Sequence, residues 1–178
     1  MITNEVLILD ALVIRQATKK DIHNVQDVLI TSQQFTYKNI FSESNIQTII
    51  HRYYNLDRLS EEIACINAKW HGYIVAEEKG NIIGVIGGGM RDETDGEVYV
   101  LYLHPEERGK GVGTRLLNHF TKIQKYNYGA EEQWVAVAKG NEYGIPFYEA
   151  RGFILQYESQ SYAALDKNDI SLWYKRTI

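Results

Sequence analysis

The chain has little of what secreted, membrane and nucleic-acid-binding proteins carry in quantity. Its 178 residues include one cysteine, Cys65, so no internal disulfide can form, which fits a reducing compartment and predicts a cytoplasmic location. No apolar run is long enough to cross a bilayer, and residues 1–5 lack the basic start of a signal peptide. A net charge of −4 and a pI near 5.7 argue against nucleic-acid binding. We therefore expect neither a nucleic acid nor a membrane as partner.

Clusters with metal-ligand spacing are also missing from the sequence. The histidines are isolated, and no His, Cys or Asp group has the spacing of a zinc or iron site, so we expect no metal. Cys65 lies among Ile63, Ala64 and Ile66 in a predicted helix. That setting predicts a small buried apolar residue rather than a nucleophile.

The pattern of apolar residues predicts one α/β domain over residues 1–178, with residues 1–11 as a short N-terminal extension. Helices are expected after Thr18, over 56–68 and 112–126, and as a short segment over 142–150 that Gly144 and Pro146 distort. Residues 33–44 break the helical pattern and are expected to be irregular. Strands are expected at 12–16, 73–76, 82–86, 97–103, 134–138, 153–158 and 170–175. This order predicts a mixed central sheet with helices on both faces.

A glycine-rich segment at residues 108–114, Arg-Gly-Lys-Gly-Val-Gly-Thr, joins an apolar strand to an amphipathic helix. The spacing fails the Walker pattern, because Gly111 follows Lys110, and it also fails Gly-x-Gly-x-x-Gly. What remains is Arg-x-x-Gly-x-Gly, from Arg108 to Gly113. Such a turn presents unpaired N–H groups and the positive end of a helix dipole, which suit a phosphate or pyrophosphate. The alternative is a plain glycine-rich connection.

A second segment narrows the choice. Residues 141–153 read Asn-Glu-Tyr-Gly-Ile-Pro-Phe-Tyr-Glu-Ala-Arg-Gly-Phe, about 30 residues after the glycines. Together the two segments resemble the GNAT superfamily of N-acetyltransferases, which pairs Arg/Gln-x-x-Gly-x-Gly/Ala with a later Asn-x-x-Ala-x-x-Phe-Tyr-x-x-x-Gly-Phe pattern. The resemblance covers roughly residues 12–178. The one departure is Gly144, where alanine is usual. The resemblance implies a GNAT-like, mixed and mostly antiparallel sheet flanked by helices on both faces.

The resemblance also implies acetyl-CoA as co-substrate and a set of residues that hold it. The pyrophosphate is expected on the backbone of the glycine-rich loop, with the Thr114 hydroxyl as a further donor. Main-chain groups of Leu101 and Leu103 are expected along the pantetheine arm, and Asn141 is expected to hydrogen-bond that arm, to cap the helix after it, or both. The expected cofactor-binding set is Leu101, Leu103, Arg108, Gly109, Lys110, Gly111, Val112, Gly113, Thr114 and Asn141. For Lys110, a solvated loop charge is an equal alternative.

Two residues are expected to carry the chemistry. By resemblance, Tyr148 is the candidate general acid, because a phenol has a pKa close enough to that of a thiol to protonate the departing thiolate. Packing in the core is the alternative for this side chain. By resemblance, Glu97 is the candidate base, taking a proton through water, and His104 or a chain of waters is the alternative. A carboxylate needs burial to become an effective base at neutral pH.

The acceptor is expected to be a primary amine. Phe35, Tyr37 and Phe41 and a run of carboxylates at Asp92, Glu93, Asp95 and Glu97 suit a small cationic amine. The chain also resembles bacterial polyamine acetyltransferases. The alternatives are a protein or peptide amine as acceptor, or a non-catalytic acyl-CoA-binding module. A homodimer is an open possibility.

Overall fold

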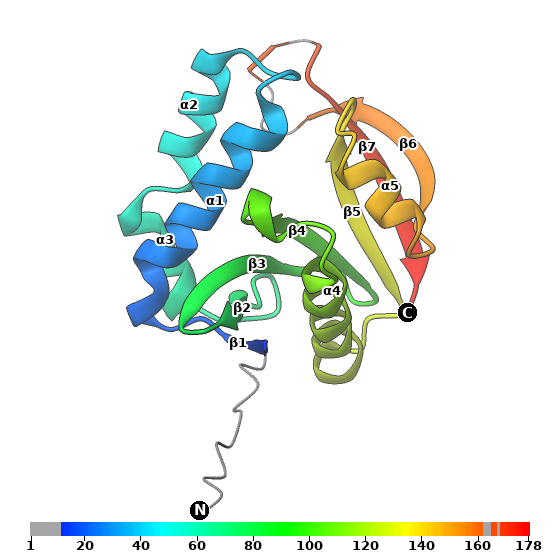
Figure 1. Ribbon diagram of the computed structural model, residues 1–178. Coiled ribbons are helices and arrows are strands. Elements are labelled where there is room, and N and C mark those ends of the chain that lie inside the picture. Colours follow the sequence, from blue (N-terminus) through cyan, green and yellow to red (C-terminus); the bar gives the residue numbers. More distant parts are fainter. Residues whose placement is uncertain (1–11, 162–164, 167) are drawn as a thin grey trace, which may run out of the picture.

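The computed structural model describes residues 12–161, 165–166 and 168–178, so the predicted extension 1–11 lies outside the described residues. The described residues form one seven-stranded sheet with helices on both faces (Figure 1). The strands are β1 (Val13–Gln16), β2 (Tyr73–Glu78), β3 (Asn81–Met90), β4 (Asp95–Leu103), β5 (Glu132–Ala138), β6 (Ile154–Gln160) and β7 (Ile170–Thr177). The helices are α1 (Ile22–Tyr37), α2 (Glu43–Tyr53), α3 (Leu56–Ala64), α4 (Val112–Lys122) and α5 (Gly144–Glu149), with short η1 (Lys19–Asp21), η2 (Pro105–Glu107) and π-helical η3 (Ile123–Asn127).

The strand order is β1-β2-β3-β4-β5-β7-β6. Every neighbouring pair is antiparallel except β4 and β5, which are parallel. This confirms the predicted α/β fold with a mixed, mostly antiparallel sheet. All seven predicted strands are present, and α5 is short, as Gly144 and Pro146 predict.

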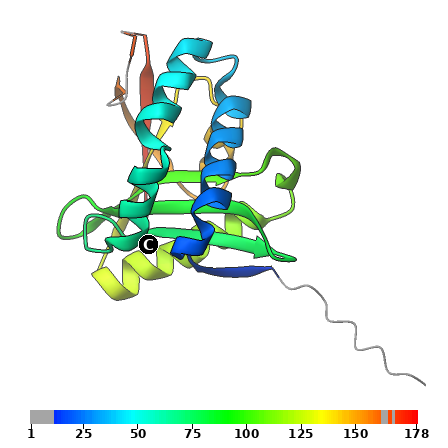
Figure 2. The same ribbon diagram turned by 90° about the vertical axis from the view of Figure 1, so that its left-hand side faces the viewer.

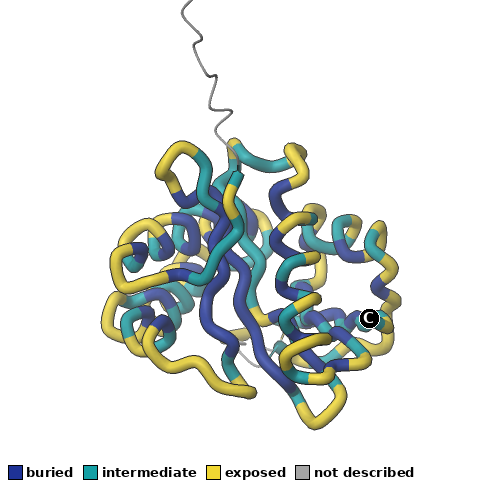
Figure 3. The backbone as a smooth tube through the Cα atoms, turned by 90° about the horizontal axis from the view of Figure 1, so that it is seen from below, coloured by how far each residue is buried: buried dark blue, intermediate teal, exposed yellow. Residues whose placement is uncertain are grey.

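Two hydrophobic cores lie on opposite faces of the sheet. In β2, Ile74 and Ala76 face α4, whereas Tyr73 and Val75 face α1 and α3. Because successive strand side chains alternate between faces, a strand covered by helices on both sides is apolar at every position. Figure 2 shows α1, α2 and α3 lying over one face, and Figure 3 shows the buried central strands between the helical layers. The central strands are therefore held by packing on both faces, and this fixes the position of the loops that follow them.

Helix α4 follows the glycine-rich loop and packs on the sheet through one apolar stripe. Val112, Leu116, Leu117 and Phe120 recur at helical spacing and are buried. Gly129, with φ +73°, ends this helical region as predicted, and its N–H donates to the Lys125 carbonyl. The stripe fixes the direction of α4 and hence the place of the loop before it.

The prediction that residues 33–44 are irregular is confirmed for 38–42 and was wrong for 33–37 and 43–44. Helix α1 continues to Tyr37, and α2 begins soon after, at Glu43. The last turns of α1 bury three polar residues whose side chains are hydrogen-bonded: the Ser32 hydroxyl donates to the Leu103 carbonyl, and Gln33 and Thr36 accept from Tyr102 and Arg108. Hydrophobic periodicity misses a helical face that is buried through polar contacts.

The helix predicted over 56–68 ends earlier, and Cys65 is exposed rather than buried. The cause is the side chain of Asn67, whose Oδ1 accepts the N–H groups of Lys69 (2.8 Å) and Trp70 (3.1 Å). An asparagine that bonds the backbone in this way favours a turn over a helix. Cys65 therefore lies just past the end of α3 instead of on its buried face.

The central strands β4 and β5 pair over a short stretch and then separate. The described pairing joins Asp95–Val98 to Glu132–Val135 and ends there. At the same place the β3–β4 ladder shifts register between Gly87 and Gly88, which pair with Val100 and Val98, so that Tyr99 bulges out of the ladder. Beyond Val98 one edge of β4 faces the space between the two halves of the sheet.

Candidate active site

The glycine-rich loop has the geometry of an anion cradle. Gly109 and Gly111 have φ of +78° and +82°, in the left-handed region that glycine adopts without strain, and Gly111 directly precedes α4. A Cβ at either residue would meet nothing within 4 Å. The loop thus presents backbone N–H groups and the start of α4 to open space, as phosphate binding requires.

The loop lines a cavity of about 390 Å³, which we call the loop cavity. Its walls are the ends of β4 and α1, the loop itself, and the segment around α5. The lining residues are Thr36, Leu101, Tyr102, Leu103, Arg108, Gly109, Gly111, Gly113, Thr114, Asn141, Tyr143, Gly144, Phe147, Tyr148 and Arg151. Eight of the ten predicted cofactor-binding residues are among them, although sequence separates them by up to about 40 positions.

Lys110 and Val112 are the two predicted residues that do not line the loop cavity. The Lys110 ammonium lies 2.9 Å from the Glu107 carboxylate on the surface, and Val112 is buried between α4 and the sheet. The structure thus favours the solvated loop charge for the Lys110 side chain. Val112 is the first residue of α4, and its side chain contributes packing to the core.

Arg108 turns its side chain inward, across the cavity. Its guanidinium donates to the Thr36 hydroxyl at 2.7 Å and stacks over the rings of Phe35 (4.8 Å) and Tyr143 (4.4 Å). Among the described residues, its buried Nη1 has no hydrogen-bond partner, and burial lowers the pKa of Arg108. A buried unpaired guanidinium N–H is costly and suits an anionic or carbonyl ligand in the cavity.

Arg151 is a cavity residue that sequence reasoning missed. Its guanidinium donates to the Thr114 hydroxyl, with Nε 3.1 Å away, and to the Phe147 carbonyl at 2.7 Å. It therefore ties the first turn of α4 to α5 and adds a second cation beside the loop. Its place one residue before Gly152, inside the second motif, was the available signal. The Thr114 hydroxyl, predicted as a donor to phosphate, serves here as an acceptor.

Asn141 hydrogen-bonds the backbone at the start of α5, which is the capping role, one of the two roles predicted for it. Its Oδ1 accepts the N–H groups of Tyr143 (3.1 Å) and Gly144 (2.9 Å) at the start of α5. The residue is buried and lines the loop cavity, so the position also permits the second role, a contact with the cofactor arm.

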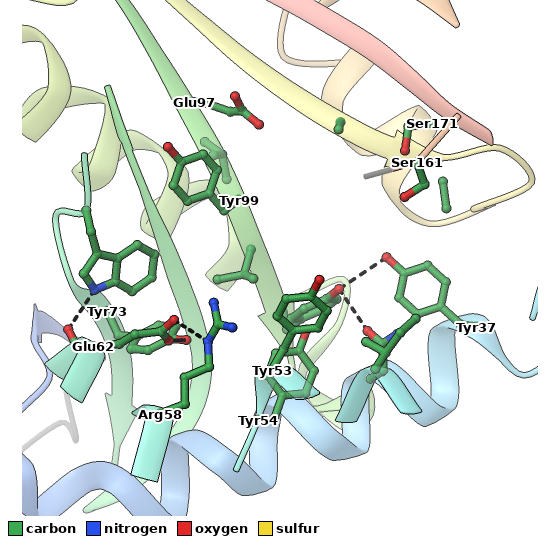
Figure 4. Close-up of a pocket in the computed structure, with 18 of the residues that line it drawn as sticks. Tyr37, Tyr53, Tyr54, Arg58, Glu62, Tyr73, Glu97, Tyr99, Ser161 and Ser171 are labelled. Carbon is green, nitrogen blue, oxygen red and sulfur yellow. Dashed lines mark hydrogen bonds and ion pairs between the residues drawn. The ribbon is translucent and has the colours of Figure 1, made fainter. Parts of the chain in front are cut away.

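A second cavity, of about 550 Å³, lies on the other side of β4, and we call it the helix cavity. It is bounded by α1, α2 and α3, by the face of β4, and by the facing ends of β5 and β7 (Figure 4). Tyr102 lines both cavities and is hydrogen-bonded to Gln33 (3.1 Å) and Tyr37 (3.3 Å). The two cavities therefore meet at β4, where the strand has left β5. Sequence reasoning singled out Tyr37 but missed Tyr102.

Glu97 is the predicted base, and it lines the helix cavity. Figure 4 shows it with Tyr99 on β4, across from Ser161 and Ser171. Burial raises the pKa of Glu97 to about 7, while the Arg91 guanidinium, 3.5 Å from its carboxylate, lowers the pKa by a smaller amount. Arg91 is itself held over the rings of Trp134 (4.3 Å) and Trp173 (4.9 Å). A carboxyl with this pKa exchanges protons at neutral pH.

Tyr148, the predicted acid, is buried and lines the loop cavity. Its ring packs edge-on against Phe147 and Phe153, so it also belongs to the core. Burial raises the pKa of Tyr148 well above the ordinary value for a phenol. The hydroxyl therefore keeps its proton at neutral pH, as a general acid must before it reacts.

The neighbouring acidic residues do not join Glu97. Asp92 accepts the N–H groups of Thr94 and Asp95 in the β3–β4 turn, and Asp95 accepts from the indole of Trp134. Asp92, Glu93 and Asp95 are absent from the lining of the helix cavity, as is His104. Asp92 and Glu93 are exposed in the turn before β4, and Asp95 is half-buried at the first residue of β4, so these three carboxylates do not face the helix cavity. The cavity instead receives Glu61, Glu62 and Asp169.

The described residues contain no cluster of three His, Cys, Asp or Glu side chains suited to a metal ion. Within the same residues, no helix combines the length and apolarity that a membrane span requires. What the site offers is a glycine cradle, two cations and an unpaired buried N–H, and this donor set fits a phosphate-bearing ligand with a long polar arm.

Comparison with known proteins shows the family to which this chain belongs. A model of the Acetyltransferase (GNAT) family matches residues 37–153. The structure is similar to that of the PaiA N-acetyltransferase from Thermoplasma acidophilum in complex with coenzyme A, with a TM-score of 0.79 and 27% identity, over 93% of this chain and 99% of that one.

Two further solved structures show the same fold at lower identity. They are a probable acetyltransferase from Staphylococcus epidermidis (TM-score 0.72, 15% identity, 94% of this chain and 99% of that one) and a ribosomal-protein-alanine N-acetyltransferase from Brucella melitensis (TM-score 0.65, 16% identity, 94% and 100%).

The site and the fold thus define an acyltransferase. The chain belongs to the GNAT family, and it is an acetyl-CoA-dependent N-acetyltransferase. The predicted co-substrate is confirmed, and the non-catalytic alternative is not retained.

Gly111→Asp is expected to abolish the thermal stabilisation that acetyl-CoA gives, because it places a negative side chain in the cradle. Thermal unfolding with and without acetyl-CoA measures this. Gly129→Asp is the matched control, since Gly129 has φ +73°, is equally open and lies outside the loop cavity. Both variants carry a similar backbone strain of about 1–2 kcal/mol. Equal stabilisation of the parent and Gly111→Asp by acetyl-CoA would show that the loop does not hold the pyrophosphate.

Proposed function

We propose that this enzyme acetylates a small cationic primary amine, such as a polyamine, with Glu97 as general base and Tyr148 as general acid. The observation that carries the proposal is the position of Glu97. Glu97 lines the helix cavity, and burial raises its pKa to about 7. It lies on β4, whose last residues, 101–103, line the loop cavity. The proposed base thus lies in the helix cavity, where we place the amine substrate, and the proposed acid lies in the loop cavity, where we place acetyl-CoA.

The lining of the helix cavity supports a cation. Its carboxylates are Glu61, Glu62, Glu97 and Asp169, against the cations Arg58 and Lys69. Glu62 is ion-paired with Arg58 (2.7 Å), which leaves an acidic excess among the described lining residues. The aromatic walls are Tyr37, Phe41, Tyr53, Tyr54, Trp70, Tyr73, Tyr99 and Tyr102. Such walls bind alkyl chains and stabilise ammonium groups, whereas an anion would meet repulsion.

In the proposed reaction, acetyl-CoA supplies the activated acetyl thioester. Glu97, ionised above its pKa, accepts a proton from the substrate ammonium, directly or through water, so that the neutral amine can attack. The amine nitrogen forms the new C–N bond, and the Tyr148 hydroxyl gives its proton to the sulfur as the C–S bond breaks. The nitrogen then releases its second proton to the Tyr148 phenolate, which leaves the neutral amide and restores the acid. Leu101 and Leu103, on the free edge of β4, offer main-chain groups to the arm. Arg108 and Arg151 hold the negative charge of the pyrophosphate.

A cytoplasmic location and a homodimer remain predictions, as does the absence of nucleic-acid and membrane partners. A protein or peptide amine is the alternative acceptor, and the first experiment below separates it from a small amine.

A diamine is expected to show a higher kcat/KM than a monoamine of the same length, because the second ammonium meets the acidic wall of the helix cavity. Initial rates of thiol release, measured over a panel of diamines, monoamines, acidic amines and peptides, test this. Added salt should narrow the gap by screening the exposed carboxylates. Faster turnover of an acidic amino acid or of a peptide N-terminus than of any diamine would refute the cationic small-molecule acceptor.

Glu97→Gln is expected to lower kcat/KM by roughly 100-fold or more, the usual worth of a general base. In the parent, activity should fall below pH 7, because Glu97 must be ionised to accept a proton and its pKa lies at about 7. The variant should lose this acidic limb. The pH–rate profiles of both proteins provide the measurement. An unchanged limb together with a raised KM would assign Glu97 to substrate attraction alone.

Tyr148→Phe is expected to lower kcat about 10- to 1000-fold, since only the acidic hydroxyl is lost. Acetyl-CoA affinity and the melting temperature should change little. Steady-state kinetics and thermal unfolding measure the two effects. If kcat is retained, or if stability falls sharply, the hydroxyl has a structural role instead.

A further inference from the structure

Gln124 is a polar side chain that the proposed mechanism does not use, and it is completely buried. It lies in η3 (Ile123–Asn127), a π-helical turn that continues α4. A π-helical turn holds one residue more than an α-helical turn, and such segments are frequent at functional sites. Here the segment places the amide of Gln124 against the α4 face of the sheet, next to the last residues of β4 that pair with β5.

The amide of Gln124 bridges two strands through their main chains. Its Nε2 donates to the carbonyl of Gly89 on β3 and to the carbonyl of Glu97 on β4, each at 3.1 Å. Its Oε1 accepts from the amide of Gln133 on β5 at 2.8 Å. Both N–H bonds and the carbonyl of one side chain are thus engaged, each with a different strand.

The backbone around Glu97 is closely packed as well as hydrogen-bonded. A Cβ on Gly96 would come within 2.6 Å of Cδ of Gln124, and a Cβ on Gly88 within 2.0 Å of the Glu97 carbonyl oxygen. Glycine at these two positions lets the amide and the neighbouring strand approach the main chain of Glu97. The carbonyl of Glu97 is therefore enclosed from both sides.

Gln124 is anchored from behind by a second set of contacts. Oε1 of Gln133 accepts from Nε (3.1 Å) and Nη2 (2.9 Å) of Arg176 and from the Thr121 hydroxyl (3.1 Å). The Gln133 side chain is completely buried. Fully satisfied buried networks of this kind fix a single arrangement of the groups that they join.

We infer that Gln124 is a positioning residue for the proposed base: it holds the main chain of Glu97, at the point where β4 leaves β5, so that the carboxylate faces the helix cavity. This inference rests on the proposed function, in which Glu97 is the base. Gln124 itself lines neither cavity, so it acts on the reaction through Glu97 alone.

The charged groups on the cavity side of Glu97 come from several elements. Arg91 lies after β3, Lys69 in the connection from α3 to β2, and Asp169 before β7. Arg58, Glu61 and Glu62 come from α3. Gln124 and Gln133 on the opposite side are uncharged, so replacing Gln124 leaves all of these charges in place. A change in the titration of Glu97 would then report altered burial or position.

The experiment compares Gln124→Met with the parent enzyme, using the best amine of the panel. Methionine keeps the volume and removes the amide, so the two carbonyls lose their donor and the main chain of Glu97 is free to shift toward the helix cavity. We expect kcat per folded enzyme to fall about ten-fold, part of the worth of a general base. We also expect the acidic limb of the pH–rate profile to move to lower pH, because a better-hydrated carboxyl has a lower pKa. The KM for acetyl-CoA should stay unchanged.

Thr121→Val is the matched control, because it removes a hydroxyl that is hydrogen-bonded to Gln133, Arg176 and the Leu117 carbonyl in the same buried network but does not touch Glu97. It should lose thermal stability while keeping the parent's kcat and pH profile. If Gln124→Met does not fold, Gln124→Asn carries the test. Its amide is one methylene shorter and cannot reach both carbonyls, so the same changes are expected.

Glu97→Gln separates the two possible failures. If Glu97→Gln loses the acidic limb but the Gln124 variants keep the parent's kcat and limb, the positioning role is overturned and the proposed base stands. If Glu97→Gln itself keeps the limb, the proposed function fails first. An equal loss of kcat in Gln124→Met and Thr121→Val, with no shift of the limb in either, would also overturn the inference, because it would indicate general destabilisation.

Discussion

The separation of β4 from β5 is the constraint on which the rest of the molecule depends. A parallel pair buried in a sheet normally continues as far as both strands do, because an unpaired buried main chain is costly. Here pairing stops at Val98 and Val135, and the bulge at Tyr99 turns β4 away at that point. The free edge of β4 then lies between the loop cavity and the helix cavity. One strand thereby lines two cavities.

The groups that stabilise this separation come from outside the two strands. On one face, Ser32 donates to the carbonyl of Leu103 and Tyr102 is hydrogen-bonded to Gln33, so α1 supports the far end of β4. On the other face, Gln124 supports the near end through the carbonyl of Glu97. The contacts from α1 lie where β5 no longer pairs with β4, whereas Gln124 holds a residue that still pairs with β5. Together they account for several of the polar side chains that are buried on the two faces of the sheet.

The sequence could predict those parts of the site whose signals are local. Three glycines before an apolar stripe predict a loop and a helix N-terminus, because glycine permits φ near +80° and the stripe sets the helical period. The strands follow from apolar runs and turn residues in the same way. The second motif added Asn141 and Tyr148, which carry no distinctive local signal of their own.

What could not be predicted depends on contacts between distant segments. The inward turn of Arg108 needs Thr36 and Tyr143, which lie 72 positions before it and 35 after it. The end of α1 is helical because its buried polar residues find partners on β4 and in the glycine-rich loop. Cys65 is exposed because Asn67 ends the helix early. For Arg108 and α1, side chains from distant segments decide the outcome, and a pattern read along one segment does not contain it. For Cys65 the deciding side chain is two positions away, and hydrophobic periodicity does not register its bonds to the backbone.

Burial has opposite consequences for the two residues to which we assign the chemistry. Removing water disfavours the charged form of either group, so the pKa of Glu97 and that of Tyr148 both rise. For a carboxyl the rise leads toward neutrality, where the group can both take and release a proton. For a phenol it leads away from neutrality, so Tyr148 keeps its proton at neutral pH. In the proposed reaction this proton passes to the sulfur while the C–S bond breaks, on the cofactor side of β4. The same physical effect, burial, thus prepares a proton acceptor in the helix cavity and preserves a proton donor in the loop cavity, on the two sides of β4. Arg91 limits the rise in the pKa of Glu97, so that its carboxylate form is still populated at neutral pH.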